Sequence, residues 1–194
     1  TLTAAVSALR KPAVKEDPDR IDKMVGVLGR SGDRLERFVD EFLELSRIQE
    51  QEITLEREDL DLKEVIDEEV ENQRVLAEDK GLELEIEPWE DFSVEGDDFV
   101  LRTSVRNLVN NAIKYTDEGS VTVSVDHDSE SFRIHVEDTG VGMTEKEQEQ
   151  IFQEFGRIKR TEGMKGTGLG LALVKKLVDT AGGRISVESE GKDE

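Results

Sequence analysis

Cysteine is absent from this 194-residue sequence, and aromatic side chains make up only 5% of it. The absence of cysteine excludes disulfide bonds and thiolate metal sites, and it fits a reducing compartment. No apolar run approaches the roughly 18 residues that a membrane-spanning helix needs. Basic residues are also scarce, because 26 Lys and Arg face 47 Asp and Glu. The net charge of −21 makes nucleic acid and anionic membrane surfaces poor partners for this segment.

The length allows one full domain and a smaller element, and the 35% hydrophobic content is enough for a packed core. The acidity has two interpretations, a well-solvated surface or adaptation to high salt, and composition alone does not decide between them. In either case, a strongly anionic ligand would need a metal ion or a local basic cluster.

Residues 1–51 show helical periodicity without strand alternation. A short apolar helix ends near Pro12, and Asp17 with Pro18 suits the start of a second helix. Apolar residues in the second helix recur at heptad spacing over roughly 50 Å. They are Ile21, Met24, Val25, Leu28, Leu35, Phe38, Val39, Phe42 and Leu45. We therefore expect an antiparallel helical hairpin, residues 1–53, that dimerises as a four-helix bundle; a long helix lying on its own domain is the alternative.

Residues 54–194 mix helix and strand patterns after a polar boundary at 52–58. Three helices are expected, at about 61–81, 97–114 and 169–180. Alternating apolar residues predict strands at about 82–86, 121–125, 132–136 and 185–187, of which the middle two form a hairpin. This mixture indicates an α/β fold, a two-layer α/β sandwich.

Three polar side chains share one face of the second of these helices, because Asn107, Asn111 and Lys114 stand at i, i+4 and i+7. An asparagine oxygen is a hard ligand that suits Mg²⁺, and a lysine suits phosphate. The pattern also fits an ordinary amphipathic helix with a solvated asparagine stripe.

Two glycine motifs follow. Asp-Thr-Gly-Val-Gly at 138–142 comes directly after a strand, where a carboxylate can accept a hydrogen bond from the adenine amino group and glycines let the backbone approach a flat ring. A simple Asp-Gly turn is the alternative. Gly-Thr-Gly-Leu-Gly at 166–170 opens a helix, whose N-terminal N–H groups and dipole favour phosphate. Since no Gly-Lys-Ser/Thr follows, this second motif is not a P-loop.

A basic island lies between the two motifs. Residues 156–166 hold four basic side chains against one glutamate, a local charge of +3 in a strongly acidic chain. The island indicates a mobile lid over phosphates, and a charged surface loop is the alternative.

In this order, and with Phe152 and Phe155, these segments resemble the N, G1, F and G2 boxes of sensor histidine kinases, over about residues 18–190. The resemblance implies a Bergerat-type ATP-binding domain with a mixed sheet, of the fold shared with gyrase-type ATPases and heat-shock chaperones. It implies ATP and Mg²⁺, transfer of the γ-phosphate to a histidine and then to an aspartate of a response-regulator receiver domain, and a homodimer through the hairpin. It also implies a cytoplasmic location, with any membrane anchor in segments outside this chain.

By position in these boxes, Asn111 resembles the Mg²⁺ ligand and Asn107 its catalytic companion. Lys114 and Tyr115 would contact phosphate or ribose, Lys114 in a catalytic role, and Asp138 would bind adenine. The other expected ATP-binding residues are Gly140, Gly142, Met143, Phe155, Arg157, Gly166, Thr167, Gly168, Leu169 and Gly170. ATP-hydrolysing relatives carry a glutamate where Asn107 stands. Because an amide cannot take a proton from water, Asn107 disfavours hydrolysis.

The family's phosphoacceptor box is matched only at its tail, by Thr1-Leu-Thr3, so we expect the acceptor histidine to lie before residue 1. His127 and His135, the two histidines of the chain, are expected to be surface residues and not phosphoacceptors. Two other functions stay open: an ATPase conformational switch of the same fold, and a non-catalytic dimerising regulatory module.

Overall fold

The computed structural model divides the chain into two compact units, Thr1–Ser46 and Arg47–Glu194. The residues it describes are 18–49, 54–90, 92–128, 131–154, 156 and 167–191. Within these ranges, no helix combines the length and the apolar character that crossing a membrane would require.

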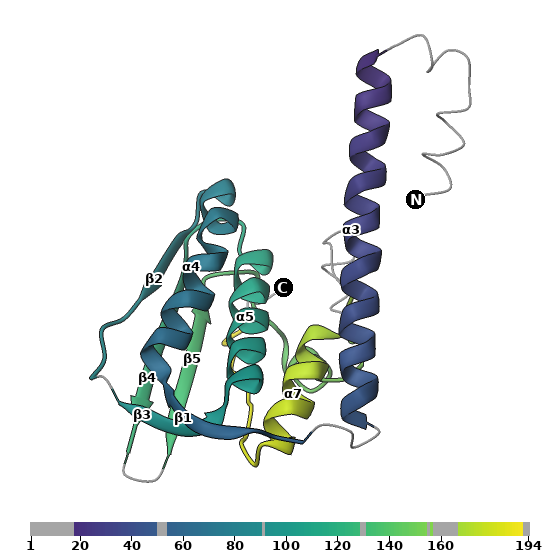
Figure 1. The fold of residues 1–194 in the computed structure, drawn as a ribbon. Coiled ribbons are helices and arrows are strands. Elements are labelled where there is room, and N and C mark those ends of the chain that lie inside the picture. The colour runs from purple at the N-terminus through teal and green to yellow at the C-terminus, as the bar shows by residue number, and fades with distance from the viewer. Residues whose placement is uncertain are drawn as a thin grey trace. The chain divides into compact units, whose positions relative to one another are not determined.

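Helix α3, Pro18–Gln49, is a continuous helix, as the heptad pattern predicts. Proline fits its first position because the N–H that proline lacks would have no helical partner there. Large apolar side chains of α3 are exposed in the single chain, among them Val25 (54%) and Leu35 (55%). The first helix of the expected hairpin falls outside the described residues, so α3 is the part of the hairpin that the structure describes (Figure 1).

Helix α4, Leu62–Lys80, begins and ends where its capping residues predict. The Asp61 carboxylate accepts a hydrogen bond from the Glu64 N–H at 3.0 Å, which caps the start of the helix. At the other end Gly81 takes a left-handed φ of 72°, and the Leu82 N–H donates to the Ala77 carbonyl at 2.9 Å. This Schellman-type ending satisfies carbonyls that the last turn would otherwise leave unpaired.

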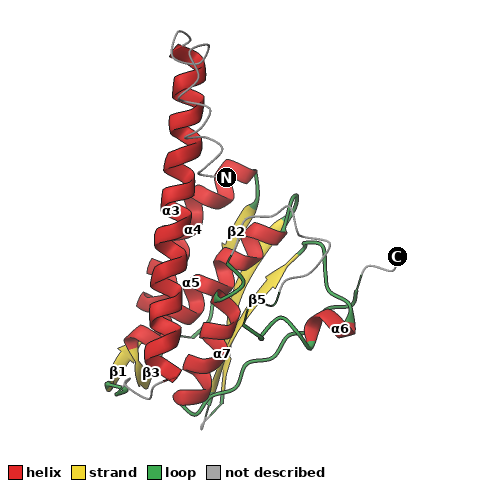
Figure 2. Cartoon of the chain, turned by 90° about the vertical axis from the view of Figure 1, so that its right-hand side faces the viewer, coloured by secondary structure: helices red, strands yellow, loops and turns green. Residues whose placement is uncertain are grey.

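A three-stranded mixed sheet, in the order β2–β4–β5, forms one layer of the second unit (Figure 2). Strand β2, Glu83–Ile86, runs parallel to β4, Ser120–His127, while β5, Phe132–Asp138, pairs antiparallel with β4. The last pairing is the expected hairpin. It places Asp138 opposite Val121, at the end of the sheet that is remote from the hairpin turn.

Helices form the other layer. Helix α5, Asp98–Tyr115, contacts α4, α7 (Gly170–Thr180) and the strands β4 and β5 (Figure 1). Its buried face includes Val105 and Val109, both fully buried in the core together with Val121 and Val123 of β4. The predicted two-layer α/β sandwich with a mixed sheet is therefore confirmed.

A second sheet and a short helix lie outside the sequence-based expectations. Strand β1, Arg57–Asp61, pairs antiparallel with β3, Ser93–Asp97, so the polar boundary expected at 52–58 runs into a strand. Leu60 is the one buried residue of β1, so the strand lacks the apolar alternation that marks strands in a sequence. Helix α6, Glu145–Gln148, is a single turn.

The expected strand at 185–187 is wrong. Ile185 and Val187 are half-buried between exposed neighbours, so the alternation of burial is present, but residues 183–191 adopt no strand. Ser189 ties this segment to the chain around α6: its hydroxyl accepts from the Met143 N–H and its carbonyl from the Gln148 side chain. A period of two predicts which side chains face inward, whereas a strand also needs a backbone partner.

Candidate nucleotide-binding site

Three segments that carry the candidate residues meet in the second unit. They are the end of α5, the last residue of β5 with the loop that follows it (residues 138–143, here called the base loop) and the start of α7. The Val141 N–H of the base loop donates to the Tyr115 carbonyl at the end of α5, at 3.3 Å. At the start of α7, a Cβ on Gly170 would lie 2.6 Å from Oδ1 of Asn107. The structure thus brings together segments that are up to about 60 residues apart in the chain.

The polar face of α5 is half-buried along its length, at Asn107, Asn111 and Lys114. The Asn107 side-chain NH₂ donates to the Thr103 carbonyl at 2.8 Å, which turns Oδ1 toward Gly170. Asn110, by contrast, donates to Gln73 of α4 and so lies on another face of the helix. The i, i+4, i+7 spacing therefore places three polar groups on the side of α5 that meets α7 and the base loop.

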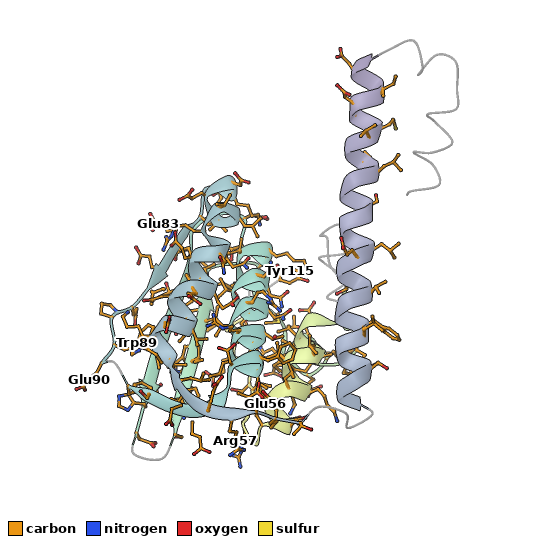
Figure 3. All side chains as sticks on the ribbon, in the orientation of Figure 1. Glu56, Arg57, Glu83, Trp89, Glu90 and Tyr115 are labelled. Carbon is orange, nitrogen blue, oxygen red and sulfur yellow. The ribbon has the colours of Figure 1, made fainter. Side chains whose placement is uncertain are left out.

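Lys114 and Tyr115 form a pair at the C-terminal end of this face. The lysine Nζ donates to the tyrosine hydroxyl at 2.7 Å and lies 4.2 Å from the centroid of its ring. Figure 3 shows Tyr115 at the end of α5. The pair supplies one positive charge and one hydroxyl, which are groups that can bind phosphate or sugar oxygens.

The base loop is held tightly against α5. The Gly140 N–H donates to Oδ1 of Asp138 at 2.9 Å, and the Asp138 side chain is exposed. A Cβ on Gly140 would lie 2.5 Å from the Tyr115 carbonyl oxygen, so no larger residue fits without moving the backbone. Gly142 has a φ of 64°, a left-handed conformation that also favours glycine. The loop therefore presents a fixed carboxylate beside a bare stretch of backbone.

Two further contacts hold the ends of the base loop, and neither could be predicted from the sequence. Thr139 Oγ1 accepts from the Ser120 N–H at 3.1 Å, which joins the loop to the start of β4. The Met143 N–H donates to Ser189 Oγ at 2.9 Å, and Gln148 of α6 donates to the carbonyl oxygens of both residues. Single hydroxyls and amides of this kind are common on any surface, so only the fold distinguishes them.

The start of α7 has no side-chain cap. Gly168 takes a φ of 79°, and the Leu169 N–H donates to Thr167 Oγ1 at 3.2 Å just before the helix begins. The Leu169 side chain is fully buried, so only its backbone can face a ligand. The uncapped first turn leaves N–H groups and the positive end of the helix dipole available to an anion.

Several expected site residues lie outside the described residues: Phe155, Arg157 and Gly166, with the rest of the basic island between 157 and 165. In the part of the chain that is described, no three His, Cys, Asp or Glu side chains gather as a metal site. A metal ion at the asparagine face would therefore depend on amide oxygens and on oxygens of its ligand.

Both histidines lie on the hairpin of β4 and β5, away from the base loop. His135 Nε2 is 2.6 Å from the Asp126 carboxylate, and the His127 ring packs at a tilt against Phe92, with the ring centroids 4.1 Å apart. The hydrogen bond from His135, with the charge of Arg133, lowers the pKa of Asp126 below its usual value, against a smaller opposing effect of desolvation.

Comparison with protein families gives a match at residues 96–193 to the histidine kinase-, DNA gyrase B- and HSP90-like ATPases. The sensor histidine kinase RcsC of Escherichia coli (strain K12) is 34% identical over 180 residues, which cover 91% of this chain and 19% of that protein. The sensor-like histidine kinase SenX3 of Mycolicibacterium smegmatis is 31% identical, over 98% of this chain and 51% of that protein. The chain thus spans only part of the length of these curated relatives.

Solved structures give the same picture. Full-length ShkA in complex with AMPPNP has a TM-score of 0.75 and 27% identity, over 89% of this chain and 36% of that one. The histidine kinase ThkA in complex with the response regulator protein TrrA has a TM-score of 0.73 and 25% identity, over 94% of this chain and 51% of that one.

Proposed function

The chain belongs to the histidine kinase-, DNA gyrase B- and HSP90-like ATPase family as the catalytic ATP-binding domain of a sensor histidine kinase, and on that premise we propose that it binds Mg-ATP and transfers the γ-phosphate to a protein histidine. The observation that carries the proposal is the meeting of three segments: the asparagine face of α5, the base loop with Asp138, and the uncapped start of α7. The base loop would bind the nucleotide base. The asparagine face of α5 and the start of α7 would bind the metal ion and the phosphates.

The base loop would hold adenine. Asp138 is exposed and its Oδ1 already accepts the Gly140 N–H, which leaves its other oxygen for the adenine amino group. Guanine has a carbonyl oxygen at that position, so the same carboxylate would repel it. Gly140 and Gly142 would let the loop backbone approach the flat ring closely, and Met143 lies at the end of the loop.

The phosphates would lie between α5 and the start of α7. Lys114 and Tyr115 supply a charge and a hydroxyl, and the first turn of α7 after Gly168 supplies backbone N–H groups. Thr167, Leu169 and Gly170 border the same place through their backbone. The basic island around Arg157 would complete the neutralisation, with Phe155 and Gly166 at its two ends.

Mg²⁺ fits the residues that the site offers. It is bound in nucleotide sites by few protein ligands together with phosphate oxygens and water, which suits an amide oxygen such as that of Asn111. When bound, the ion would neutralise the charge that develops on the phosphate oxygens during transfer. Half-burial of Asn111 leaves its amide within reach of such a complex.

The transfer itself would be a displacement at the γ-phosphorus. An imidazole nitrogen of the acceptor forms the new N–P bond, the bond from phosphorus to the bridging oxygen breaks, and ADP leaves with that electron pair. Asn107 favours transfer over hydrolysis, because an amide cannot deprotonate water as a carboxylate at this position could. Its NH₂ donates to the Thr103 carbonyl, which fixes the orientation of the side chain. Asn107 would orient the reaction, while positioning and charge neutralisation supply most of the rate.

Helix α3 would carry the dimer interface of a four-helix bundle and hold the acceptor hairpin. Its exposed apolar side chains, such as Val25 and Leu35, need a partner surface. The phosphohistidine would then pass its phosphate to an aspartate of a response-regulator receiver domain, since the similar kinase ThkA is known in complex with a response regulator. In this proposal the function is cytoplasmic, and neither nucleic acid nor membrane takes part in this segment.

Radiolabelled ATP tests the proposal. The chain is mixed with Mg²⁺, [γ-³²P]ATP and a separately prepared hairpin that carries an acceptor histidine, and labelling is followed by gel. We expect label on the added hairpin, acid-labile and alkali-stable as phosphohistidine is, and none on His127 or His135 of this chain. Label that stays on this chain, or steady phosphate release without labelled hairpin, contradicts the proposal; the second result identifies an ATPase switch.

A further inference from the structure

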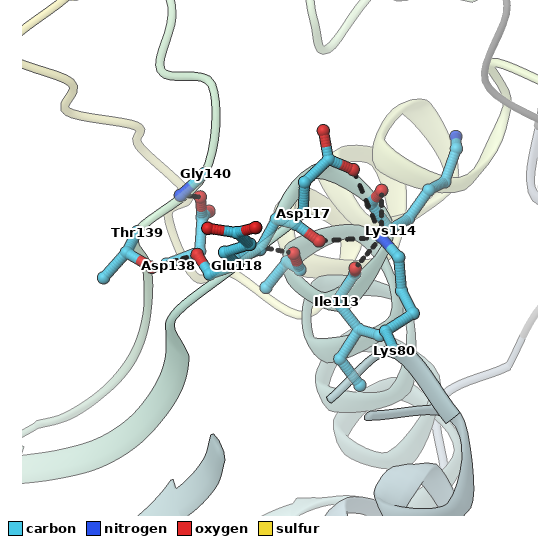
Figure 4. Close-up of polar contacts among 10 residues, drawn as sticks. Lys80, Ile113, Lys114, Asp117, Glu118, Asp138, Thr139 and Gly140 are labelled. Carbon is cyan, nitrogen blue, oxygen red and sulfur yellow. Dashed lines mark hydrogen bonds and ion pairs between the residues drawn. The ribbon is translucent and has the colours of Figure 1, made fainter. Parts of the chain in front are cut away.

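A lysine that belongs to none of the sequence motifs holds the end of α5. The Nζ of Lys80, in the last turn of α4, donates to three main-chain oxygens (Figure 4). They belong to Ile113 at 2.9 Å, Lys114 at 3.0 Å and Thr116 at 2.7 Å. Because an ammonium group has three protons, these hydrogen bonds use all of them. The Asp117 carboxylate, 3.9 Å from the same nitrogen, adds an opposite charge.

These oxygens lie where a helix leaves its last carbonyls unpaired. Helix α4 satisfies its own with the left-handed Gly81, but α5 ends at Thr116 with a φ of −100° and no glycine. The N–H and the hydroxyl of Thr116 both donate to Ala112, one turn back. Lys80 therefore caps α5 from a neighbouring helix and places a positive charge at the negative end of its dipole.

The Tyr115 carbonyl lies between the Lys114 and Thr116 carbonyls that Lys80 caps, and the base loop packs against it. Tyr115 O accepts the Val141 N–H at 3.3 Å, and Gly140 packs directly on it. Lys80 holds the carbonyls on both sides of that oxygen, those of Lys114 and Thr116. Any rotation of this last turn would move Tyr115 O and therefore the loop.

We propose that Lys80 is a positioning residue of the nucleotide site: by fixing the last turn of α5 through three carbonyls, it sets where the base loop, and with it Asp138, meets the nucleotide base. The inference rests on the proposed nucleotide binding. Lys80 does not bind phosphate itself, because its three protons are already used. It acts on the base end of the site, so its loss affects ATP and ADP alike.

The test compares Lys80→Met, which keeps the alkyl chain and removes the donors, with Lys63→Met as a matched control. Lys63 lies at the other end of α4, about 25 Å away at 1.5 Å per residue, where it pairs with Asp67. Calorimetry gives the affinity for Mg-ATP and for ADP. Amide hydrogen exchange, resolved by NMR, gives the protection of the Val141 N–H and of the N–H groups in β4.

For Lys80→Met we expect about tenfold weaker binding of both nucleotides, the loss that one or two hydrogen bonds to a charged group would give. The Val141 amide should exchange faster while β4 keeps its protection, and Lys63→Met should match the wild type. A purely structural role would instead speed exchange throughout the domain.

Three results overturn the inference: wild-type affinity in Lys80→Met, an equal loss in Lys63→Met, or faster exchange everywhere. If Lys80→Met does not fold, Lys80→Arg replaces it, because the charge is kept but a planar guanidinium cannot converge on three carbonyls. It should show the same direction of change, and wild-type affinity in it overturns the inference. If the wild type binds no nucleotide, the proposed function fails, while Val141 exchange still tests the role of Lys80.

Discussion

Three polar side chains of the candidate site are oriented by partners close to them in the chain. Asn107 donates to Thr103, Lys114 donates to Tyr115, and Asp138 accepts from Gly140. Such local hydrogen bonds fix which atom of each side chain is left for a ligand, so less ordering remains to be done on binding.

Asp138→Asn should weaken Mg-ATP binding by about tenfold or more. The new amide can still accept the Gly140 N–H through its oxygen, but its NH₂ would face the adenine amino group, donor against donor. Calorimetry measures the affinity. Asp126→Asn is the control, because it removes the same charge near the turn of the β4–β5 hairpin, where Asp126 pairs with Arg133. Equal affinity in wild type and Asp138→Asn would sink the assignment of the base loop.

Asp126 should contribute stability that depends on pH. Its pKa is lowered from 3.8, chiefly by the hydrogen bond from His135, so folding favours the ionised carboxylate. The contribution is therefore present above pH 3.8 and is lost as the pH falls through the lower pKa of the folded state. The carboxylate is exposed, so the effect is small. Urea midpoints of wild type and Asp126→Asn should differ at neutral pH and converge in acid; a constant difference contradicts the prediction.

At the scale of elements, the site depends on how closely backbone segments approach. The base loop touches α5 through Gly140 and Val141, and α7 touches α5 where Gly170 faces Asn107. The two contacts differ in how well they tolerate a larger residue in place of glycine. An atom added at Gly140 meets main-chain oxygen, which cannot move without the helix, whereas one added at Gly170 meets the end of a side chain.

Gly140→Ala should lower the free energy of unfolding by about 1–3 kcal/mol, as overpacking in a closed contact does. It should weaken nucleotide binding as well, because the base loop must move off Tyr115. Gly32→Ala is the matched control: Gly32 lies in α3, and among the described residues nothing beyond its chain neighbours and its own helix backbone comes within 4 Å of the added Cβ. It should stabilise its helix by about 0.5–1 kcal/mol. Denaturant unfolding measures both, and a neutral Gly140→Ala would show that the loop is not held where we describe it.

At the scale of the whole molecule, acidic charge is in large excess. The net charge is −21, and some basic side chains already pair with acidic ones, as Arg102 does with Asp98 and Glu68. The unpaired acidic groups repel one another, which disfavours the compact state. The local +3 of residues 156–166 stands out against this background as the place where a polyphosphate would be least opposed.

Added salt should therefore stabilise the protein. Raising the ionic strength from about 0.01 M to about 1 M shortens the Debye length from about 30 Å to about 3 Å and screens the repulsion. The thermal midpoint should rise steeply at first and then level off, with similar effects of NaCl and KCl. Calorimetry measures it, and an uncharged solute of equal osmolarity is the control. A midpoint that does not change with salt contradicts the prediction.

Much of the fold could be predicted from local patterns. Asp61 and Gly81 mark the ends of α4, and the valines of β4 mark a half-buried strand, because caps and periodicity depend on neighbouring residues alone. Strand β1 could not be predicted, since it pairs through its backbone and buries one side chain. The strand expected at 185–187 fails for the opposite reason: the pattern of burial is present, but the backbone of residues 183–191 adopts no strand.

Local sequence patterns are enough to predict which chemical groups the site offers: two amides and a lysine on one helical face, a carboxylate at the end of a strand, and glycines before a helix. They are enough because the helical and strand repeats assign each side chain to a face. How these groups are held together can be seen only in the folded protein. Lys80 donates hydrogen bonds to carbonyls at the end of α5, and the Val141 N–H donates to the Tyr115 carbonyl. In each case the two partners are more than 20 positions apart in the chain. Because nearly every residue carries a main-chain N–H and carbonyl, no pattern of side chains could predict these contacts.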